Sequence, residues 1–329
     1  MDRRSESPRV VSLGEVMIRY SPPGKTRLEE ATVLEVRAAG AEANFAAVYA
    51  RLGLNAAWIS RLTDNPLGRL IERSISRYGV DTSHIIWTDQ DRVGTYYIEF
   101  GSPPRPTRLL YDRRGSAISR LRVEEMDWAP IRDSALFHIT GITPALSDSC
   151  RQVTLRAIEE AHAGGALVSF DLNYRSKLWT PEEAEPVMRE CFAQADIVFC
   201  SPEEAELIFG LAATGGQGGG PEAVLEWIAE EFHPQVAVLK MGSEGAVAWQ
   251  GGALHRVGVY PTETVDPIGT GDAFVGGFVY GYLTGDVRKA LRYGAAIAAL
   301  KRTIPGDIAL VTLDEVEELL STQDQSIRR

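Results

Sequence analysis

From about residue 130 onward, short apolar runs alternate regularly with longer helical patterns. The runs ALFHIT (135–140), ALVSFDLN (166–173) and DIVFCS (196–201) are nearly continuous in apolar residues, which predicts buried strands. The segments after them carry the glycine stops and early prolines of helices. Repeated strand–helix units of this kind predict a mainly parallel sheet with helices on both faces. Ligands bind such sheets beyond the carboxyl ends of the strands.

Two pairs of short strand-like runs interrupt this alternation near the start of the chain. VMIRY (16–20) and VLEVR (33–37) bracket a PPGK turn, and segment 93–113 has two such runs around SPPRP. Turn residues between strand-like runs predict hairpins, so we expect a small β-sheet apart from the main one, acting as a lid. The expected lid comprises 15–39 and 93–118, the expected core comprises 9–14, 40–92 and 119–315, and we expect flexible ends at 1–8 and 321–329.

The charge balance excludes several classes of partner. The 329 residues include 34 Lys and Arg against 45 Asp and Glu, a net charge of −11. This opposes binding to nucleic acid or an anionic membrane, which needs a basic face, although local arginines could still bind a small anion. No apolar run approaches the roughly 20 residues of a membrane span, and MDRRSESPRV lacks the apolar segment of a signal peptide. The three cysteines are scattered and lack CxxC spacing, so a disulfide framework is not expected. Together these features predict a protein of the reducing cytoplasm.

The stretch VDPIGTGDAF (265–274) carries the most specific chemistry. Gly269 and Gly271 permit a tight turn, and the amides of 269–272 then open a helix, where unpaired N–H groups and the helix dipole attract an anion. Asp272 would repel that anion, so it is a candidate base for a hydroxyl that attacks a phosphoryl group. An aspartate cap, with the glycines serving helix packing, explains the same residues equally well.

Polar residues also follow two of the predicted strands. Asp171, Asn173 and Arg175 crowd the end of strand 166–173, where Arg175 could grip a carboxylate or phosphate. A salt bridge between Asp171 and Arg175 is the alternative. Glu204 lies at the start of the next helix, where it either complements the helix dipole or positions Mg²⁺ through water.

Two further segments could border ligands. In LKMGSEGA (239–246), Gly242 and Gly245 indicate either a simple hairpin or a close backbone approach to a nucleotide with Lys240 near its phosphates. In hairpin 93–113, Tyr96 and Tyr111 would leave apolar area exposed on a thin sheet. They therefore cover a substrate, form a dimer seam, or do both on different faces.

Together these segments resemble the ribokinase/PfkB carbohydrate kinase family over nearly the whole chain. The resemblance is carried by AGAEANFAA (39–47) and DPIGTGDAFVGGF (266–278). Within the family, GAEAN, TGITPALS (140–147), DLNYRSKLW (171–179) and LLYDRRGSA (109–117) are most similar to 2-keto-3-deoxygluconate kinases. The resemblance implies a ribokinase-like three-layer α/β core with a discontinuous β lid. It also implies phosphorylation of the terminal hydroxyl of 2-keto-3-deoxygluconate by ATP with Mg²⁺.

The same resemblance assigns roles to residues. Gly269, Thr270 and Gly271 would form an anion hole, Asp272 would be the base, and Arg175 would lie near the transferring phosphate. The implied substrate residues are Gly40, Ala41, Asn44, Tyr96, Tyr111, Arg113, Arg175, Asp272 and Asp307, the last next to Gly306 in the loop after the last core helix. The implied nucleotide residues are Asn173, Ser201, Glu204, Lys240, Gly242, Gly245, Gly269 and Gly271, with Glu204 positioning Mg²⁺ through water. Two positions depart from the family pattern: Ala39 replaces a glycine, and Ser201 replaces the asparagine of an NxxE motif.

Three alternatives remain beside this prediction. A 5-dehydro-2-deoxygluconate kinase or a fructokinase would use the same scaffold, although a neutral sugar has less use for Arg113 and Arg175. A non-catalytic sugar or nucleotide sensor is also possible on this scaffold, but it would not need the intact GTGD. Exposed lid strands with unpaired edges further predict a homodimer or higher homo-oligomer formed through the lid.

Overall fold

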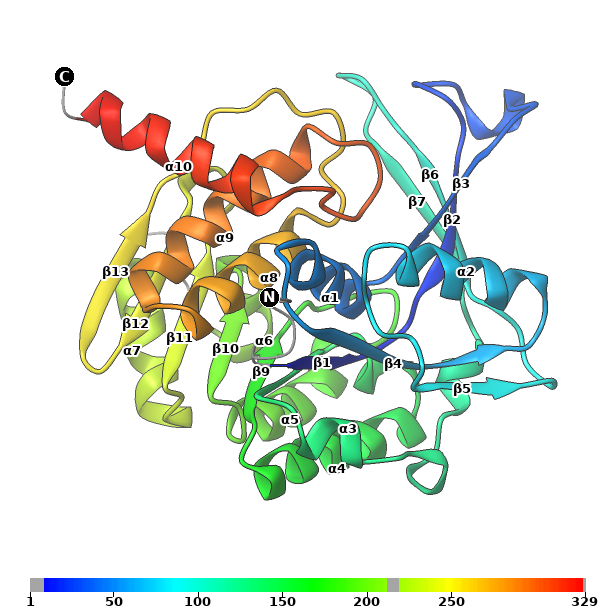
Figure 1. Ribbon diagram of the computed structural model, residues 1–329, viewed down its shortest axis with the longest axis horizontal. Coiled ribbons are helices and arrows are strands. Elements are labelled where there is room, and N and C mark those ends of the chain that lie inside the picture. Colours follow the sequence, from blue (N-terminus) through cyan, green and yellow to red (C-terminus); the bar gives the residue numbers. More distant parts are fainter. Residues whose placement is uncertain (1–8, 212–218, 328–329) are drawn as a thin grey trace.

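A nine-stranded sheet forms the centre of the molecule, and its strands come from the apolar runs of the sequence (Figure 1). The computed structural model describes residues 9–211 and 219–327. Seven neighbouring strands of this sheet run parallel, and the last two strands at one edge pair antiparallel. In spatial order the strands are β13 (Ala253–Val257), β12 (Ala246–Gln250), β11 (Val236–Lys240), β10 (Ile197–Cys200), β9 (Leu167–Asp171), β8 (Leu136–Thr140), β1 (Val10–Leu13), β4 (Ala56–Thr63) and β5 (Ile85–Thr88).

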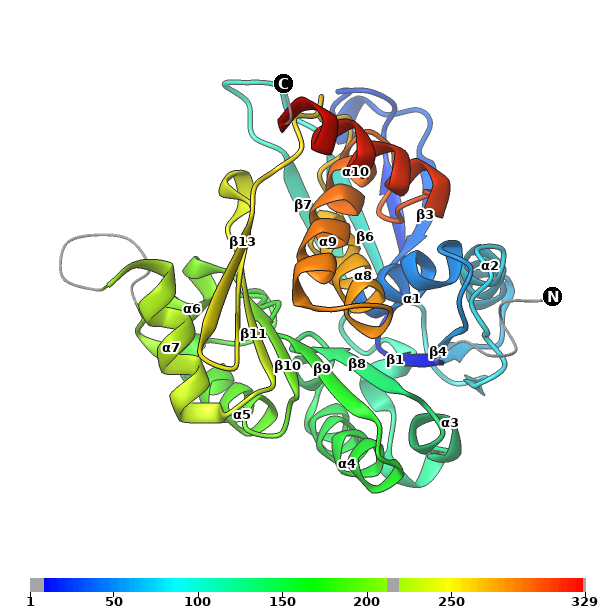
Figure 2. The ribbon, with the colours of Figure 1, turned by 60° about the vertical axis from the view of Figure 1, so that its left-hand side comes forward.

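Helices cover both faces of this sheet, and a separate apolar cluster fills each interface (Figures 1 and 2). One face carries α1 (Ala41–Arg51), α2 (Pro66–Ser76), α8 (Thr270–Leu283), α9 (Val287–Arg302) and α10 (Leu313–Ile327). The other carries α3 (Ala129–Arg132), α4 (Asp148–Gly164), α5 (Pro181–Phe192), α6 (Pro202–Phe209) and α7 (Gly220–Phe232). Short 3₁₀ helices occupy Leu28–Glu30, Ala117–Arg120, Val123–Glu125, Pro144–Leu146 and Gly242–Glu244. The predicted three-layer α/β core is therefore confirmed.

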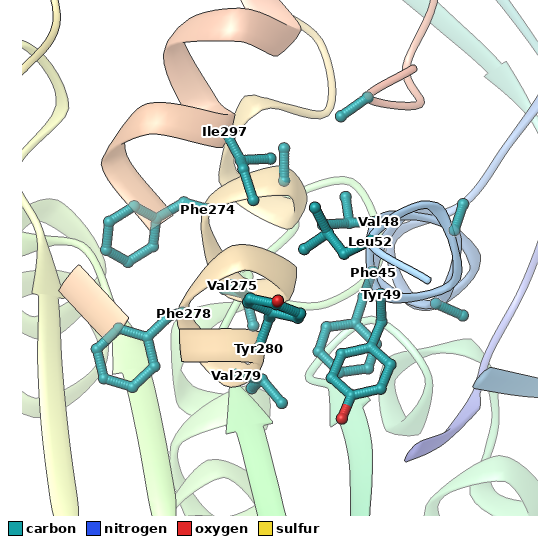
Figure 3. Close-up of a cluster of buried hydrophobic side chains, with 14 of the residues drawn as sticks. Phe45, Val48, Tyr49, Leu52, Phe274, Val275, Phe278, Val279, Tyr280 and Ile297 are labelled. Carbon is teal, nitrogen blue, oxygen red and sulfur yellow. The ribbon is translucent and has the colours of Figure 1, made fainter. Parts of the chain in front are cut away.

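Glycines allow α8 to lie very close to its neighbouring helices. A Cβ at Gly276 would lie 2.8 Å from the Cβ of Val48 in α1, and one at Gly281 would lie 2.6 Å from the Cα of Ala290 in α9. Phe45 and other large apolar side chains fill the space around this contact (Figure 3). This packing fixes the start of α8 beside the start of α1, which matters because both starts lie at the cavity described below.

A second, four-stranded sheet stands apart from the core, as predicted (Figure 1). Its order is β3 (Glu35–Ala39), β2 (Met17–Ser21), β6 (Thr95–Glu99) and β7 (Arg108–Asp112). One face buries Met17, Ala39, Tyr96 and Ile98 in a small apolar cluster of its own. All four strands lie within the two segments, 15–39 and 93–118, that we assign to the lid from the sequence.

Apart from the short 3₁₀ helices, four elements are absent from the sequence-based prediction, which are β5, α3, β13 and α10. Strand β13 is largely exposed and carries polar residues, so it lacks the apolar run of a core strand. Helix α10 buries only two of its side chains fully, those of Val316 and Leu320, and most of the residues around them are acidic or polar. It continues to Ile327, through most of the range 321–329 for which we predict a flexible end. The predicted flexible N-terminal end, 1–8, lies outside the described residues.

A buried ionic network fastens the lid to the core. Arg19 of β2 is only 1% exposed; its Nη2 donates to Asp266 Oδ2 at 2.8 Å, and its Nη1 donates to Asp307 Oδ1. The hydroxyl of Tyr96, from β6, donates to the other oxygen of Asp307. Lys301 of α9 donates to the backbone oxygen of Asp266 at 2.7 Å. Two lid strands, the loop before α8 and the loop after α9 thus meet at one buried cluster of charges.

We expect the variant Arg19→Met to lose about 3–5 kcal/mol of unfolding free energy, because it leaves the buried carboxylate of Asp307 without a cationic partner and that of Asp266 with Lys301 alone. Urea unfolding of the purified chain measures this loss. Arg151→Met is the matched control, because Arg151 makes a 3.7 Å pair with Glu190 in which both side chains are 44% exposed. Such a pair contributes about 1 kcal/mol or less, so equal losses in the two variants would contradict the role given to Arg19.

Candidate active site

A cavity of about 280 Å³ lies between the inner face of the lid and the carboxyl ends of β9 and β11. Most of the residues proposed from the sequence line it, although they come from distant parts of the chain. They are Gly40, Ala41, Asn44, Tyr96, Tyr111, Arg113, Asn173, Arg175, Lys240, Gly269, Thr270, Gly271, Asp272 and Asp307. Ser201, Glu204, Gly242 and Gly245 do not line this cavity.

The turn before α8 needs a glycine at position 269. Gly269 caps the helix with φ of +80°, and a Cβ there would lie 2.0 Å from the backbone oxygen of Asp307. The amide of Thr270 bonds to Pro267 and that of Ala273 bonds to Gly269. The amides of Gly271 and Asp272 lie between these two, at the positive end of the helix dipole. An anion site and a carboxylate therefore share one helical turn at the cavity.

Asp272 is oriented by a side chain from the other end of the sequence. Asn44 Nδ2, in the first turn of α1, donates to Asp272 Oδ2 at 2.7 Å. Gly40 caps α1, and a Cβ at this position would lie 1.9 Å from the backbone oxygen of Glu15. The GAEAN segment and the GTGD segment, which the sequence offers as separate motifs, thus form one wall of the cavity.

Asp171, at the end of β9, does not form the salt bridge with Arg175 that the sequence offers as an alternative. Asp171 forms its salt bridge with Lys240, whose Nζ lies 2.5 and 2.7 Å from the two carboxylate oxygens, and not with Arg175. Lys240 ends β11, two strands away from Asp171, so the pairing depends on sheet order and not on local sequence. Burial opposes the charge on Lys240, but Asp171 raises its pKa above the ordinary value. Arg175 donates instead to Asn173 Oδ1 at 2.6 Å and remains exposed.

Arg113 also has a carboxylate partner that the sequence-based prediction omits. Its Nε donates to Glu15 Oε2 at 2.7 Å, and its Nη2 donates to the same oxygen. The Glu15 side chain is 2% exposed, and its other oxygen has no hydrogen-bond partner among the described residues. Glu15 lies two residues beyond the end of β1, and its place just after a strand was the available sequence signal. Arg113 therefore lines the cavity as one half of an ion pair.

Glu42 is a second carboxyl group that the prediction omits. Its Oε1 accepts hydrogen bonds from the hydroxyls of Thr140, at 2.7 Å, and Thr143, at 2.9 Å. Complete burial raises the pKa of Glu42 to about 7. Its position within GAEAN, between the sugar-site residues implied by the resemblance, was the only sequence signal.

The residues proposed for the nucleotide divide into two groups. Gly242 and Gly245 line a smaller cavity of about 60 Å³ against α9, and Thr270 lines both this cavity and the larger one. Glu204 makes a capping box with Ser201 and also accepts the amide of Tyr174 at 2.8 Å. Its contribution to Mg²⁺ stays a prediction. Within residues 9–211 and 219–327, no group of three or more His, Cys, Asp or Glu is placed to hold a metal.

A family model described as pfkB family carbohydrate kinase matches residues 7–313. The chain belongs to this family. It is 43% identical to 2-dehydro-3-deoxygalactonokinase of Haloferax volcanii, over 97% of this chain and 99% of the relative. It is 31% identical to 5-dehydro-2-deoxygluconokinase of Shouchella clausii, over 95% and 96%. The crystal structure of 2-dehydro-3-deoxygluconokinase from Thermotoga maritima superposes with a TM-score of 0.89 at 33% identity, over 96% and 99% of the two chains.

The predicted family and fold are thus confirmed, and this PfkB kinase is a phosphotransferase with an alcohol acceptor. In the part of the chain that the structure describes, no helix is long and apolar enough to cross a membrane.

The raised pKa of Glu42 predicts a pH-dependent stability difference. Between about pH 4.5 and 7 this carboxyl keeps its proton in the folded chain and loses it in the unfolded chain, so its contribution to stability falls as pH rises. Glu42→Gln removes that loss. When the pH is raised from 5 to 8, we expect the unfolding free energy of the wild type to fall by about 3 kcal/mol more than that of the variant. Urea unfolding at both pH values measures the gain, and a constant difference between the two proteins would contradict the raised pKa.

Proposed function

We propose that this kinase phosphorylates the terminal hydroxyl of 2-dehydro-3-deoxygluconate or of its C4 epimer, 2-dehydro-3-deoxygalactonate, with Mg·ATP as the phosphoryl donor. The observation that carries the proposal is the bond from Asn44 to Asp272 at the N-terminus of α8, facing a cavity that also contains arginines. The names of the relatives support an acidic sugar as the acceptor.

In the proposed reaction, the hydroxyl oxygen of the sugar acid attacks the γ-phosphorus of ATP. The bond from that phosphorus to the bridging oxygen breaks, ADP leaves, and the hydroxyl proton passes to the Asp272 carboxylate. The amides of the 269–272 turn face the charge on the transferring group. Each bond formed is matched by one broken, and no further reactant is needed.

The nucleotide would extend from this turn toward the smaller cavity that Gly242 and Gly245 line. Thr270 borders both cavities, so a phosphate chain at the turn would connect the two. Mg²⁺ typically keeps several waters and binds through one or two carboxylates plus phosphates. In the proposed complex the metal would bind with the nucleotide, and Glu204 would contact it through water.

The second candidate acceptor is 5-dehydro-2-deoxygluconate, which the 31% identical relative favours. It is also an acid, so the charges of the cavity do not separate it from the first. Following ADP release with the three sugar acids and with fructose, each at matched concentration, distinguishes the candidates. Turnover of fructose alone would contradict the proposed acceptor class.

The variant Asp272→Asn tests the proposed base. We expect kcat to fall about 10²- to 10⁴-fold, because the hydroxyl loses its proton acceptor, while the KM of the sugar acid changes little. Asp286→Asn is the matched control, because Asp286 also lies at a helix start, where it caps α9 and is exposed. Near wild-type turnover in Asp272→Asn would show that another group takes the proton.

We further propose that two copies pair through the outer faces of their lids. Val36, Tyr20, Tyr97 and Leu110 form one row across the four strands, and Val36 and Leu110 are 48% and 56% exposed. The rings of Tyr20 and Tyr97 stack in the middle of this row. A second copy of the same surface would cover this apolar row.

Sedimentation velocity tests the pairing of lids. We expect a dimer for the wild type and a monomer for Val36→Lys, because the variant places a charge in the apolar row. Leu207→Lys, a change at a 51% exposed leucine of α6, should remain a dimer. A monomeric wild type, or a dimeric Val36→Lys, would contradict the proposal.

A further inference from the structure

Lys301 is a buried charged residue that takes no part in the proposed reaction. It lies in the last turn of α9, its exposed fraction is 0%, and it lines neither the acceptor cavity nor the smaller cavity beside it. A fully buried lysine is uncommon, because an ammonium group is costly to remove from water. The contacts of Lys301 therefore indicate which part of the molecule its charge stabilises.

These contacts lead to the turn before α8. Lys301 Nζ donates to the backbone oxygen of Asp266 at 2.7 Å and lies 4.0 Å from Asp266 Oδ1. The backbone amides of Val265 and Asp266 donate to the carbonyl oxygen of Arg302, the next residue of α9, at 2.8 and 3.1 Å. Gly269, the N-cap of α8, follows Asp266 by only three residues. The end of α9 thus holds the segment that leads into the 269–272 turn.

Asp266 connects Lys301 to this turn through its side chain as well. Its Oδ1 accepts the amide of Ile268 at 3.0 Å, and its Oδ2 accepts the amide of Gly306 at 2.9 Å. The turn itself packs closely on the loop after α9, because a Cβ at Gly269 would lie 2.0 Å from the backbone oxygen of Asp307. The 269–272 turn is therefore supported by the buried cluster of charges to which Lys301 belongs.

The charges of this cluster balance only while Lys301 is protonated. The cluster comprises two carboxylates and two cations, which are Asp266, Asp307, Arg19 and Lys301. Loss of the Lys301 proton would leave two carboxylates against one cation. That negative charge would lie close to backbone amides that are proposed to face an anion, so it would weaken anion binding there.

We infer that the positive charge of Lys301 supports the binding of the ATP phosphates at the 269–272 turn, and that Lys301 is a positioning residue that acts through Asp266 without touching a substrate. This inference rests on the proposed function, which places the phosphates at that turn. A cation beside the turn raises the electrostatic potential there, and the protein interior screens this effect less than water does. The bond to the Asp266 carbonyl also holds the backbone from which the turn starts.

A pH dependence of ATP binding follows from this arrangement. Burial lowers the pKa of Lys301 to about 8; Arg19 adds to this shift, and the carboxylates of Asp266, Asp307 and Asp272 oppose it. The ammonium form predominates below that pH and the neutral amine above it. Because bound phosphates favour the ammonium form, they raise the pKa of Lys301, and ATP binding takes up protons. The affinity for ATP therefore falls as the pH rises through about 8.

The test measures the Kd of Mg·ATP by calorimetry between pH 6.5 and 9.5, with no acceptor present. The variant Lys301→Gln keeps a donor for the Asp266 carbonyl but removes the charge. At pH 7 we expect its Kd to be roughly tenfold higher than that of the wild type, because one partly screened charge is lost. With the same coupling, the Kd of the wild type should rise toward tenfold across the pH range, whereas that of the variant should stay within about twofold.

The wild type alone provides a second measurement. A tenfold coupling places the pKa of Lys301 about one unit higher in the complex, so binding at pH 8.5 should take up about half a proton per ATP. Calorimetry in buffers of different ionisation enthalpy measures this uptake, and Lys301→Gln should lack it. This measurement does not depend on whether the variant folds, which urea unfolding at pH 7 checks separately.

Lys289→Gln is the matched control. Lys289 lies in the same helix and also donates to a backbone oxygen, that of Thr284 at 3.3 Å, but it lies outside the cluster. This variant should keep the Kd and the pH dependence of the wild type. A folded Lys301→Gln with wild-type Kd and pH dependence, or a wild type that takes up no proton, would overturn the inference. Since none of these measurements uses an acceptor, a wild type inactive on every sugar acid would overturn only the proposed function.

Discussion

The contact of Arg19 with Asp266 and Asp307 is the constraint on which the site depends. The lid has only a small apolar cluster of its own, and such a sheet needs further attachment to hold a fixed position. Asp266 also accepts the amide of Ile268 at 3.0 Å and that of Gly306 at 2.9 Å. One buried cluster of charges therefore fixes the lid and the turn that leads into the anion site. Because charges are expensive to bury alone, loss of either partner of a buried pair in this cluster would leave the other charge uncompensated.

The same rule of pairing explains how an acidic protein can bind an acid. Most charges at the inner cavity are matched within the chain, as in Lys240 with Asp171 and Arg113 with Glu15. Because each pair is neutral overall, these residues line the cavity without adding a strong net electrostatic potential to it. Arg175, which has no salt-bridge partner among the described residues, is exposed, and there solvent reduces the cost of an unpaired charge. A small anion thus meets a local positive potential despite the net charge of −11.

Much of the fold and part of the site could be predicted from the sequence, because those features are local. Apolar runs give the parallel strands, and GTGD and GAEAN contain the residues that form one cavity wall. The residues missed, Arg19, Glu15 and Glu42, acquire their meaning from partners far away in the chain. The rejected pair of Asp171 with Arg175 has the same cause, because Lys240 reaches Asp171 only through sheet order. Strand β13 and helix α10 were not predicted, because both are mostly exposed and their sequences lack an apolar pattern.

The attachments of the lid to the core differ in strength from one strand to another. At β2 and β6 the lid is held by buried charges, whose separation costs several kcal/mol. At β7 it is held by two exposed contacts, the hydrogen bond from Lys177 to the backbone oxygen of Leu109 and the ion pair of Arg92 with Asp112, and each contributes about 1 kcal/mol or less. Any displacement of the lid therefore costs least along β7, the strand that brings Tyr111 to the cavity wall.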